Sequence, residues 1–238
     1  MIFGIVLAGG VGSRMNTTAN MPKQFLPLGD KPIVMQTLDK FVTCDRFDAV
    51  YIGTHPDWVD HMAELVETHI VSDIPITVVA GGSDRNATLF NVIAKIEEDH
   101  GEDENHIIVT HDAVRPFVTL RMINENIDAA QKYGAVDTVV PATDTIVRSL
   151  DGEFIESIPD RSKLYQGQTP QSFNMNLLKK LFAELTEEEK AVLTDACKIC
   201  ALRGAKVRLV EGSAQNIKIT TVGDYKIAQA MLGGIIVD

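Results

Sequence analysis

The feature that most constrains the fold is an alternation of β-rich runs and helical periodicity across the first 140 residues. Runs rich in Val, Ile and Thr predict strands at residues 2–8, 48–54, 76–80, 106–110 and 135–142. Between them lie apolar stripes with helical spacing: Val34, Leu38, Phe41 and Val42; Val59, Met62, Ala63 and Val66; and Leu89, Val92, Ile93 and Ile96. This alternation predicts an α/β fold, a Rossmann-like, mostly parallel sheet with helices on both faces. Ligands of such sheets bind beyond the carboxyl ends of the strands, so we expect the site in the loops there.

The pattern changes at residue 143, where two β-rich runs flank Asp151-Gly152 and predict a β-hairpin arm over residues 143–163. Two lone strands are only marginally stable in water, so the arm packs either on its own domain or on another subunit. We favour another subunit, because the arm interrupts a continuous α/β alternation. The remaining chain predicts a helix at 176–185, a capping box at Thr186 and Glu189, strands at 205–212 and 216–220, and a closing helix at 224–232. We therefore expect one domain over residues 1–238, with the arm as its dimerisation element.

The charge balance limits the possible partners. The chain has 22 Lys and Arg residues against 33 Asp and Glu residues, a formal net charge of −11. This balance argues against a non-specific nucleic-acid binder, so any phosphate site must be local. The sequence has neither an apolar stretch of about 18 residues nor the pattern of a signal peptide. We expect a cytoplasmic protein that binds neither nucleic acid nor membrane.

The chain has three cysteines, Cys44, Cys197 and Cys200. The spacing of the last two invites a redox or zinc interpretation. However, their segment has helical character, both thiols fall on one apolar face, and no second pair of ligands accompanies them. We expect buried structural thiols.

The first loop, LAGGVGSRM at residues 7–15, follows a predicted strand and precedes a predicted helix. Free backbone N–H groups at such a position form a cradle for phosphate. Gly10, Gly12 and Met15 fall one glycine short of the dinucleotide fingerprint GxGxxG, and no Walker loop GxxxxGK[ST] is present. A nucleophile elbow GxSxG is also missing around Ser13, so acyl transfer is not expected.

Two cations, Arg14 and Lys23, belong to this loop region. A transferring phosphoryl group needs positive charge and hydrogen-bond donors preorganised around its oxygens. An isolated pair of this kind would be read as solvated surface residues. The glycine loop beside them favours a role in binding and activating phosphate.

A second glycine turn, GGSDRNAT at residues 81–88, follows the predicted strand 76–80. Its small polar residues suit hydrogen bonds to a base or ribose. Ser83 or Asp84 equally suits the N-cap of the next helix, and the sequence leaves both roles open.

Two carboxylates are candidate metal ligands. Asp112 follows the predicted strand 106–110, where it is placed to hold Mg²⁺ between phosphates, or to form a structural ion pair with Arg115. Asp224 is the second candidate, although its spacing from Thr221 equally suits a helix cap. His111 is weak evidence for a catalytic triad, because no serine nucleophile lies near it.

Six segments, taken in order and spacing, resemble the IspD/TarI group of cytidylyltransferases: LAGGVGSRM, MPKQFLPLGDKPI, AGGSDRNAT, HDAVRPF, YQGQTPQSF and NIKIT. The resemblance covers nearly the whole chain. It implies transfer of CMP from CTP to a polyol phosphate, with release of pyrophosphate and with Mg²⁺. The acceptor's own phosphate oxygen would be the nucleophile, and it is already anionic near neutral pH, so no general base is required.

The resemblance also implies roles for single residues. Arg14 and Lys23 would stabilise the transition state, Asp112 would carry the metal, and Arg161 and Lys218 would position the acceptor's phosphate. The CTP-binding residues would be Leu7, Ala8, Gly9, Gly10, Gly12, Gly81, Gly82, Ser83, Asp84, Arg85, Asn86, Ala87, Thr88 and Asp112. In this family the arm reaches across a homodimer, so Arg161 would serve the neighbouring subunit.

The acceptor differs between branches of the group. Enzymes acting on methylerythritol 4-phosphate usually have Pro-Ala-Ala-Gly in the first loop, the motif HDAARP, and an acidic TDEAS-like segment. This chain has Leu7-Ala8-Gly9-Gly10, Val114 in HDAVRP, and TDACKI at 194–199, and so resembles the ribitol branch. We favour D-ribitol 5-phosphate, the precursor of wall teichoic acid, over 2-C-methyl-D-erythritol 4-phosphate of isoprenoid synthesis.

Two rival functions remain at this stage. An NAD-dependent dehydrogenase would need the missing third glycine and an acidic residue after the second strand, where Gly53-Thr54-His55 stands. A non-catalytic nucleotide sensor would need the pocket, but not a set of charges aimed at a transition state.

Overall fold

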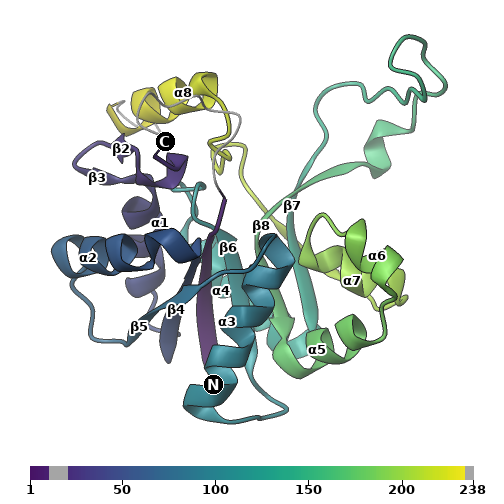
Figure 1. Ribbon diagram of the computed structural model, residues 1–238. Helices are drawn as coiled ribbons and strands as arrows, with labels where there is room; N and C mark the ends of the chain where they lie inside the picture. Colours follow the sequence, from purple (N-terminus) through teal and green to yellow (C-terminus); the bar gives the residue numbers. More distant parts are fainter. Residues whose placement is uncertain (11–20, 234–238) are drawn as a thin grey trace.

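The computed structural model describes residues 1–10 and 21–233, and its centre is a seven-stranded sheet in the order β5-β4-β1-β6-β8-β7-β9 (Figure 1). The strands are β1 (Ile2–Ala8), β4 (Ala49–Thr54), β5 (Ile76–Ala80), β6 (Ile107–Asp112), β7 (Ala135–Pro141), β8 (Tyr165–Asn174) and β9 (Arg208–Glu211). β8 runs antiparallel to both β6 and β7, whereas the other neighbouring pairs are parallel. The expected mostly parallel α/β sheet is therefore confirmed. A separate two-stranded ribbon pairs β2 (Pro27–Leu28) with β3 (Lys31–Pro32).

Helices cover both faces of the sheet (Figure 1). The α-helices are α1 (Ile33–Val42), α2 (Val59–His69), α3 (Arg85–His100), α4 (Leu120–Tyr133), α5 (Met175–Ala183), α6 (Glu187–Ala191), α7 (Ala196–Leu202) and α8 (Val222–Gly233), and the short 3-10 helices are η1 (Lys23–Phe25), η2 (Pro56–Trp58) and η3 (Arg161–Lys163). The apolar faces of α3, α5 and α7 bury one side of the sheet, and those of α1, α2 and α4 bury the other. Side chains alternate along a strand, so Phe3 and Ile5 of β1 enter the first core and Val6 enters the second.

β8 was not predicted, because its sequence YQGQTPQSFN lacks the usual apolar character of a buried strand. Its polar side chains at Gln168, Thr169, Gln171 and Ser172 are nevertheless buried, and they are held by specific partners. The Ser172 hydroxyl donates to the Asn126 side chain (3.1 Å), and the Gln171 amide donates to Asp137 (3.1 Å). Burial is possible here because these groups are hydrogen-bonded.

The predicted strand at 216–220 is wrong. These residues form no strand. Their apolar side chains instead join a small hydrophobic cluster: Ile219 packs with Leu28 and Ile33, and Ile217 packs against this cluster. Their alternation of polar and apolar residues reflects this packing. The Ile219 N–H donates to the Val114 carbonyl (2.9 Å) instead of to a neighbouring strand.

The arm protrudes from the body between β7 and β8 (Figure 1). The predicted hairpin is only partly correct, because its two limbs join at one antiparallel bridge, Arg148 to Ser157, and lack the expected ladder. Gly152 supplies a left-handed residue at the turn (φ 80°). Leu150 and Phe154 on the arm are 76% and 73% exposed. The first of the two alternatives, in which the arm packs on its own domain, is therefore not seen.

Several local expectations are confirmed. Thr186 and Glu189 form the predicted capping box at the start of α6. Cys44, Cys197 and Cys200 are buried free thiols, and burial raises the pKa of each. Among the described helices, none is long and apolar enough to cross a membrane.

Candidate active site

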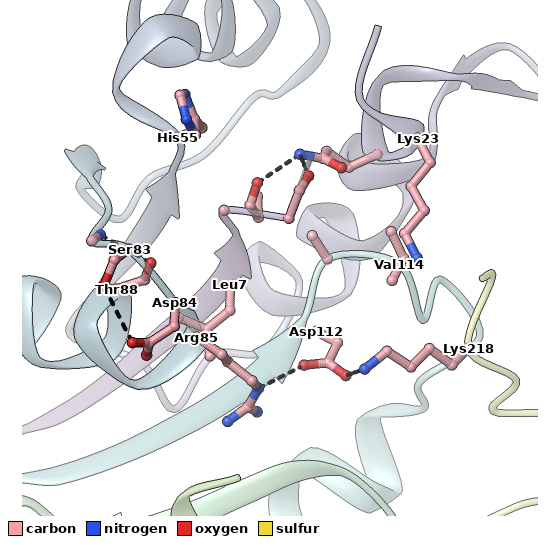
Figure 2. A pocket seen from close by; sticks show the side chains of 16 residues that line it. Leu7, Lys23, His55, Ser83, Asp84, Arg85, Thr88, Asp112, Val114 and Lys218 are labelled. Atoms are coloured by element: carbon pink, nitrogen blue, oxygen red, sulfur yellow. Dashed lines mark hydrogen bonds and ion pairs between the residues drawn. The ribbon is translucent and has the colours of Figure 1, made fainter. Parts of the chain in front are cut away.

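A cavity of about 450 Å³ opens at the carboxyl ends of the central strands and beside the N-terminus of α3 (Figure 2). This is the position that the open α/β sheet predicts for a ligand. Its lining residues are Leu7, Ala8, Gly9, Gly10, Lys23, Gln24, His55, Gly82, Ser83, Asp84, Arg85, Thr88, Asp112, Ala113, Val114 and Lys218. The two glycine loops and the carboxylate singled out in the sequence therefore meet at one cavity.

The second glycine turn packs closely against the end of β4 and the first turn of α3. A Cβ atom at Gly81 would lie 2.8 Å from the Thr54 carbonyl oxygen, and one at Gly82 would lie 2.5 Å from the Ala87 Cβ atom. The Gly82 N–H also donates to the Thr88 hydroxyl (3.1 Å). Only glycine permits this approach, because a side chain at either position would displace backbone or a rigid neighbour.

Asp84 is the N-cap of α3. Its carboxylate accepts hydrogen bonds from the N–H groups of Asn86 (2.8 Å) and Ala87 (2.9 Å), so the capping alternative is confirmed for this residue. Ser83 is exposed and donates to Asp84 (3.3 Å). The capped N-terminus of α3 lies at the cavity, where a helix end favours negative charge.

Asp112 lies at the centre of a cluster of cations. Its carboxylate is 2.8 Å from Lys218 Nζ, 3.2 Å from Arg85 Nε and 3.7 Å from Arg115 Nε. Burial alone would raise the pKa of Asp112, but the charges of Arg85 and Lys218 hold it well below its usual range. The carboxylate is therefore ionised at neutral pH. The expected pair with Arg115 is present, but it is the longest of the three.

His111, the residue before Asp112, supports this cluster through hydrogen bonds. Its Nε2 lies 3.0 Å from the Arg115 carbonyl, which only accepts, so this nitrogen carries the proton. Its Nδ1 then accepts from the Thr169 hydroxyl (2.8 Å), and that hydroxyl accepts from the Asp112 N–H (3.2 Å). Burial lowers the pKa of His111 to about 4, so the ring stays neutral. His111 is thus a structural histidine.

The segment that carries Lys218 is anchored on both sides. Asn216 is fully buried, and its amide donates to the Thr169 carbonyl (2.8 Å) and to Gln168 (3.2 Å). The Arg115 guanidinium donates to the Asn216 carbonyl (2.7 Å). On the other side, Ile219 pairs with Val114 through the backbone, which places Lys218 opposite Asp112 (Figure 2).

The cations and the helix N-terminus around this cavity can bind an anion and stabilise charge that develops on it.

A model of the family described as IspD, 2-C-methyl-D-erythritol 4-phosphate cytidylyltransferase, matches residues 2–234. The chain belongs to this family. It is therefore a cytidylyltransferase, and the dehydrogenase and sensor interpretations are wrong.

Solved structures of IspD enzymes share the fold. The 4-diphosphocytidyl-2C-methyl-D-erythritol synthase of Anaerococcus prevotii is 26% identical, with a TM-score of 0.79 over 98% of this chain and 96% of that one. The 2-C-methyl-D-erythritol 4-phosphate cytidylyltransferase of Francisella tularensis is 25% identical, with a TM-score of 0.77 over 95% and 97% of the two chains. The enzyme of the same name from Thermus thermophilus is 24% identical, with a TM-score of 0.73 over 98% and 100%, and shows likeness of fold alone.

Some residues expected at an IspD-type site lie elsewhere or outside the described part of the chain. Gly12 and Arg14 fall within residues 11–20, which the structure does not describe. Arg161 is exposed on the arm, where its guanidinium donates to the Thr143 carbonyl (2.7 Å). The remaining residues that were expected to bind CTP but do not line the cavity are Gly81, Asn86 and Ala87.

Asp224 forms the helix cap that its spacing suggested. Its carboxylate accepts from the N–H groups of Thr220 (2.9 Å) and Thr221 (2.8 Å), and its own N–H donates to the Thr221 hydroxyl (3.2 Å). Burial would raise the pKa of Asp224, but hydrogen bonds from the Thr220 hydroxyl and from these two N–H groups lower it to about 2. Within the described residues, no group of three or more His, Cys, Asp or Glu side chains could hold a metal ion. A metal role for Asp224 stays a prediction.

Among the residues that line the cavity, His55 and Gln24 were not predicted from the sequence. His55 follows β4, and its Nδ1 accepts from the Asp57 N–H (3.2 Å). Gln24 is buried next to Lys23 and bonds to the first loop. The position of His55 directly after a parallel strand was a usable signal, whereas the contacts of Gln24 have no local signature.

Proposed function

We propose that this cytidylyltransferase transfers CMP from CTP to D-ribitol 5-phosphate, giving CDP-ribitol and pyrophosphate for wall teichoic acid synthesis. One observation carries the choice of acceptor. Leu7 and Val114 line the cavity at positions where sequences of the methylerythritol branch usually have Pro and Ala. The third departure, at Cys197, lies in a buried helix away from the cavity and carries no weight for the acceptor.

Val114 supports this choice through its size. Its side chain belongs to the cluster of Leu28, Ile33 and Ile219, and its carbonyl holds the residue that follows Lys218. The valine side chain has two carbon atoms more than that of alanine, so it leaves less room on this side of the cavity. Methylerythritol phosphate carries a methyl branch that ribitol phosphate lacks. A difference of one such group in a close-fitting pocket discriminates by roughly 10- to 200-fold.

In the proposed reaction, an oxygen of the acceptor's phosphate attacks the α-phosphorus of CTP. The new P–O bond forms as the bond to the bridging oxygen of the β-phosphate breaks, and pyrophosphate leaves with that electron pair. The nucleophile is already anionic, so no side chain has to remove a proton. Lys23 at the cavity, together with Arg14, stabilises the charge that grows on the α-phosphoryl oxygens.

CTP is proposed to lie between the two glycine loops. Residues 7–10 and 82–85 line the cavity and allow a ligand to approach the backbone closely, and the α3 N-terminus favours a negatively charged ligand. Support comes from the tight contacts of Gly82 with Thr88 and Ala87. Asp112 and Arg85 close the floor of this space.

Asp112 fits the proposed Mg²⁺. Magnesium is commonly held by one or two carboxylates together with the phosphates of a nucleotide, so a single ionised Asp112 is a sufficient protein ligand. The bound ion would neutralise charge on the triphosphate. Asp112 supplies a carboxylate whose low pKa keeps it charged; Arg85 holds one of its oxygens, and the other pairs with Lys218.

Lys218 and Arg161 are proposed to hold the acceptor's phosphate. Lys218 lines the cavity, whereas Arg161 belongs to the protruding arm and does not. Exposed apolar side chains on the arm, including Leu150 and Phe154, favour a second copy of the chain as its support. We therefore propose a homodimer in which Arg161 completes the cavity of the partner.

A second candidate acceptor is 2-C-methyl-D-erythritol 4-phosphate. The comparisons favour it, because the matching family model and the similar structures are described by that substrate. An identity of 25–26% over this length leaves room for a change of acceptor within the family.

The deciding experiment is pyrophosphate release from CTP and Mg²⁺ with each acceptor under matched conditions. We expect release with ribitol 5-phosphate and a kcat/KM at least about tenfold lower with methylerythritol 4-phosphate. We also expect Val114→Ala to move this ratio toward methylerythritol phosphate, because the substitution opens room beside Lys218. Release with methylerythritol 4-phosphate alone would establish the second candidate and contradict our reading of Leu7 and Val114.

A further inference from the structure

Gln24 is a buried polar side chain whose amide nitrogen bonds to the first glycine loop. It is 2% exposed, and its amide nitrogen donates to the Ala8 carbonyl (2.6 Å) and to the Gly10 carbonyl (3.0 Å). We infer that Gln24 is a positioning residue that holds residues 8–10 of this loop in the shape that binds CTP. The inference rests on CTP being the nucleotide substrate and is independent of the acceptor.

Glutamine suits this position because its amide nitrogen carries two donor hydrogens. The two carbonyl groups on either side of Gly9 each accept one of them. A Met side chain of similar length would leave both carbonyls without these donors. A Glu side chain would place a carboxylate, which only accepts, against two carbonyl oxygens.

The orientation of the loop follows from these bonds. In a trans peptide the C=O and N–H groups point in opposite directions, so fixing the Ala8 carbonyl toward Gln24 directs the Gly9 N–H away from Gln24. The same bonds cover the negative ends of two carbonyl dipoles beside a cavity proposed to hold a triphosphate. Ala8, Gly9 and Gly10 all line that cavity.

Gln24 can act on the loop because η1 is itself anchored. The next residue, Phe25, is buried, and its ring lies 5.1 Å from the Trp58 ring and 5.0 Å from the His61 ring. Such aromatic contacts fix the short helix on α2 and η2. The preceding residue, Lys23, lines the cavity, so Gln24 links the glycine loop to the lysine proposed to act on the transition state.

The test is Gln24→Met. We expect the Kd for CTP, measured by calorimetry without acceptor, to rise by roughly tenfold, as for the loss of buried hydrogen bonds. We expect the KM for CTP to rise with it, while the KM for the acceptor at saturating CTP stays within about twofold. A residue that merely stabilised the fold would lower the amount of active enzyme and leave both KM values unchanged.

Gln36→Met is the matched control. Gln36 in α1 also donates to a carbonyl, that of Leu28 (2.8 Å), and to Asp30 (3.3 Å), but it does not line the cavity. We expect this variant to bind CTP as the unmodified enzyme does. Thermal unfolding of both variants shows whether each is folded at the temperature of the assay.

Gln24→Glu adds a second test by charge. We expect weaker CTP binding than in Gln24→Met at pH 8, with partial recovery as the pH is lowered and the Glu carboxyl gains a proton. An unchanged Kd for CTP in folded Gln24→Met would overturn the inference. Failure of the unmodified enzyme to bind CTP would instead contradict the proposed function, so the two results are distinguishable.

Discussion

The two halves of the cavity are built in different ways. The nucleotide side consists of loops that follow the parallel strands β1 and β5, and its residues lie together within one chain. The acceptor side combines Lys218, from an irregular segment, with the proposed contribution of Arg161, which lies on the arm and outside its own cavity. This difference fits our proposal that one chain binds the triphosphate by itself, whereas the acceptor's phosphate is bound with the help of a second copy.

The largest expected effect concerns the nucleotide side. Lys23→Ala should lower kcat by roughly 10² to 10³, with a smaller effect on CTP affinity, because the lysine is proposed to stabilise charge that grows in the transition state. Steady-state kinetics with varied CTP measures both quantities. Lys31→Ala is the control, since Lys31 pairs with Asp39 (2.7 Å) and lies outside the cavity. Unchanged turnover in Lys23→Ala would remove the assigned role.

The second prediction concerns the acceptor side, where a substitution should affect the kinetics of the acceptor and not those of CTP. Arg161→Ala should lower kcat/KM for the acceptor by roughly 10- to 100-fold through loss of a charge-assisted contact, while the KM for CTP stays unchanged. Arg148→Ala is the control, because Arg148 lies on the same arm and pairs with Glu156 (2.9 Å). If Arg161→Ala changed the affinity for CTP and left kcat/KM for the acceptor unchanged, the proposed assignment of Arg161 to the acceptor side would be contradicted.

A smaller effect concerns His111, the buried histidine beneath Asp112, and the dependence of stability on pH. The pKa of His111 is about 4 in the fold and about 6.5 when unfolded, so the unfolded state binds the extra proton between these values. Its contribution to stability is complete above about pH 6.5 and is lost as the pH falls toward 4. From pH 7 to 5 the free energy of unfolding should drop by about 2 kcal/mol from this group.

Urea denaturation at several pH values measures this dependence. His111→Gln should flatten the decline between pH 6.5 and 4, whereas His69→Gln, at the end of α2, should leave it unchanged. An equally steep decline in His111→Gln would show that the buried ring is not the responsible group.

The sequence predicted the nucleotide half better than the acceptor half. β1, β4, β5 and β6 follow from short apolar runs, because parallel strands buried on both faces are apolar throughout. β8 escaped prediction since its buried polar residues are satisfied by distant partners, as Ser172 is by Asn126. Such pairings between distant residues cannot be predicted from the local pattern of polar and apolar residues.

The same limit applies to the site. Asp112 was predicted from its place after a strand, but its nearest cations, Lys218 and Arg85, come from remote segments that only the fold brings together. Gln24 was missed because its role rests on bonds across 14 and 16 residues. The strand expected at 216–220 was wrong for a related reason, since its apolar residues pack on Leu28 and Ile33.

Activity of mixed dimers tests the central claim most directly. Lys23→Ala and Arg161→Ala protomers are mixed in equal amounts, subunit exchange is confirmed, and pyrophosphate release is measured. If Arg161 serves the partner's cavity, each heterodimer has one intact site, and the mixture regains about a quarter of the unmodified activity. If both residues serve the cavity of their own chain, the exchanged mixture stays at the mean of the two variants, and the shared site is contradicted.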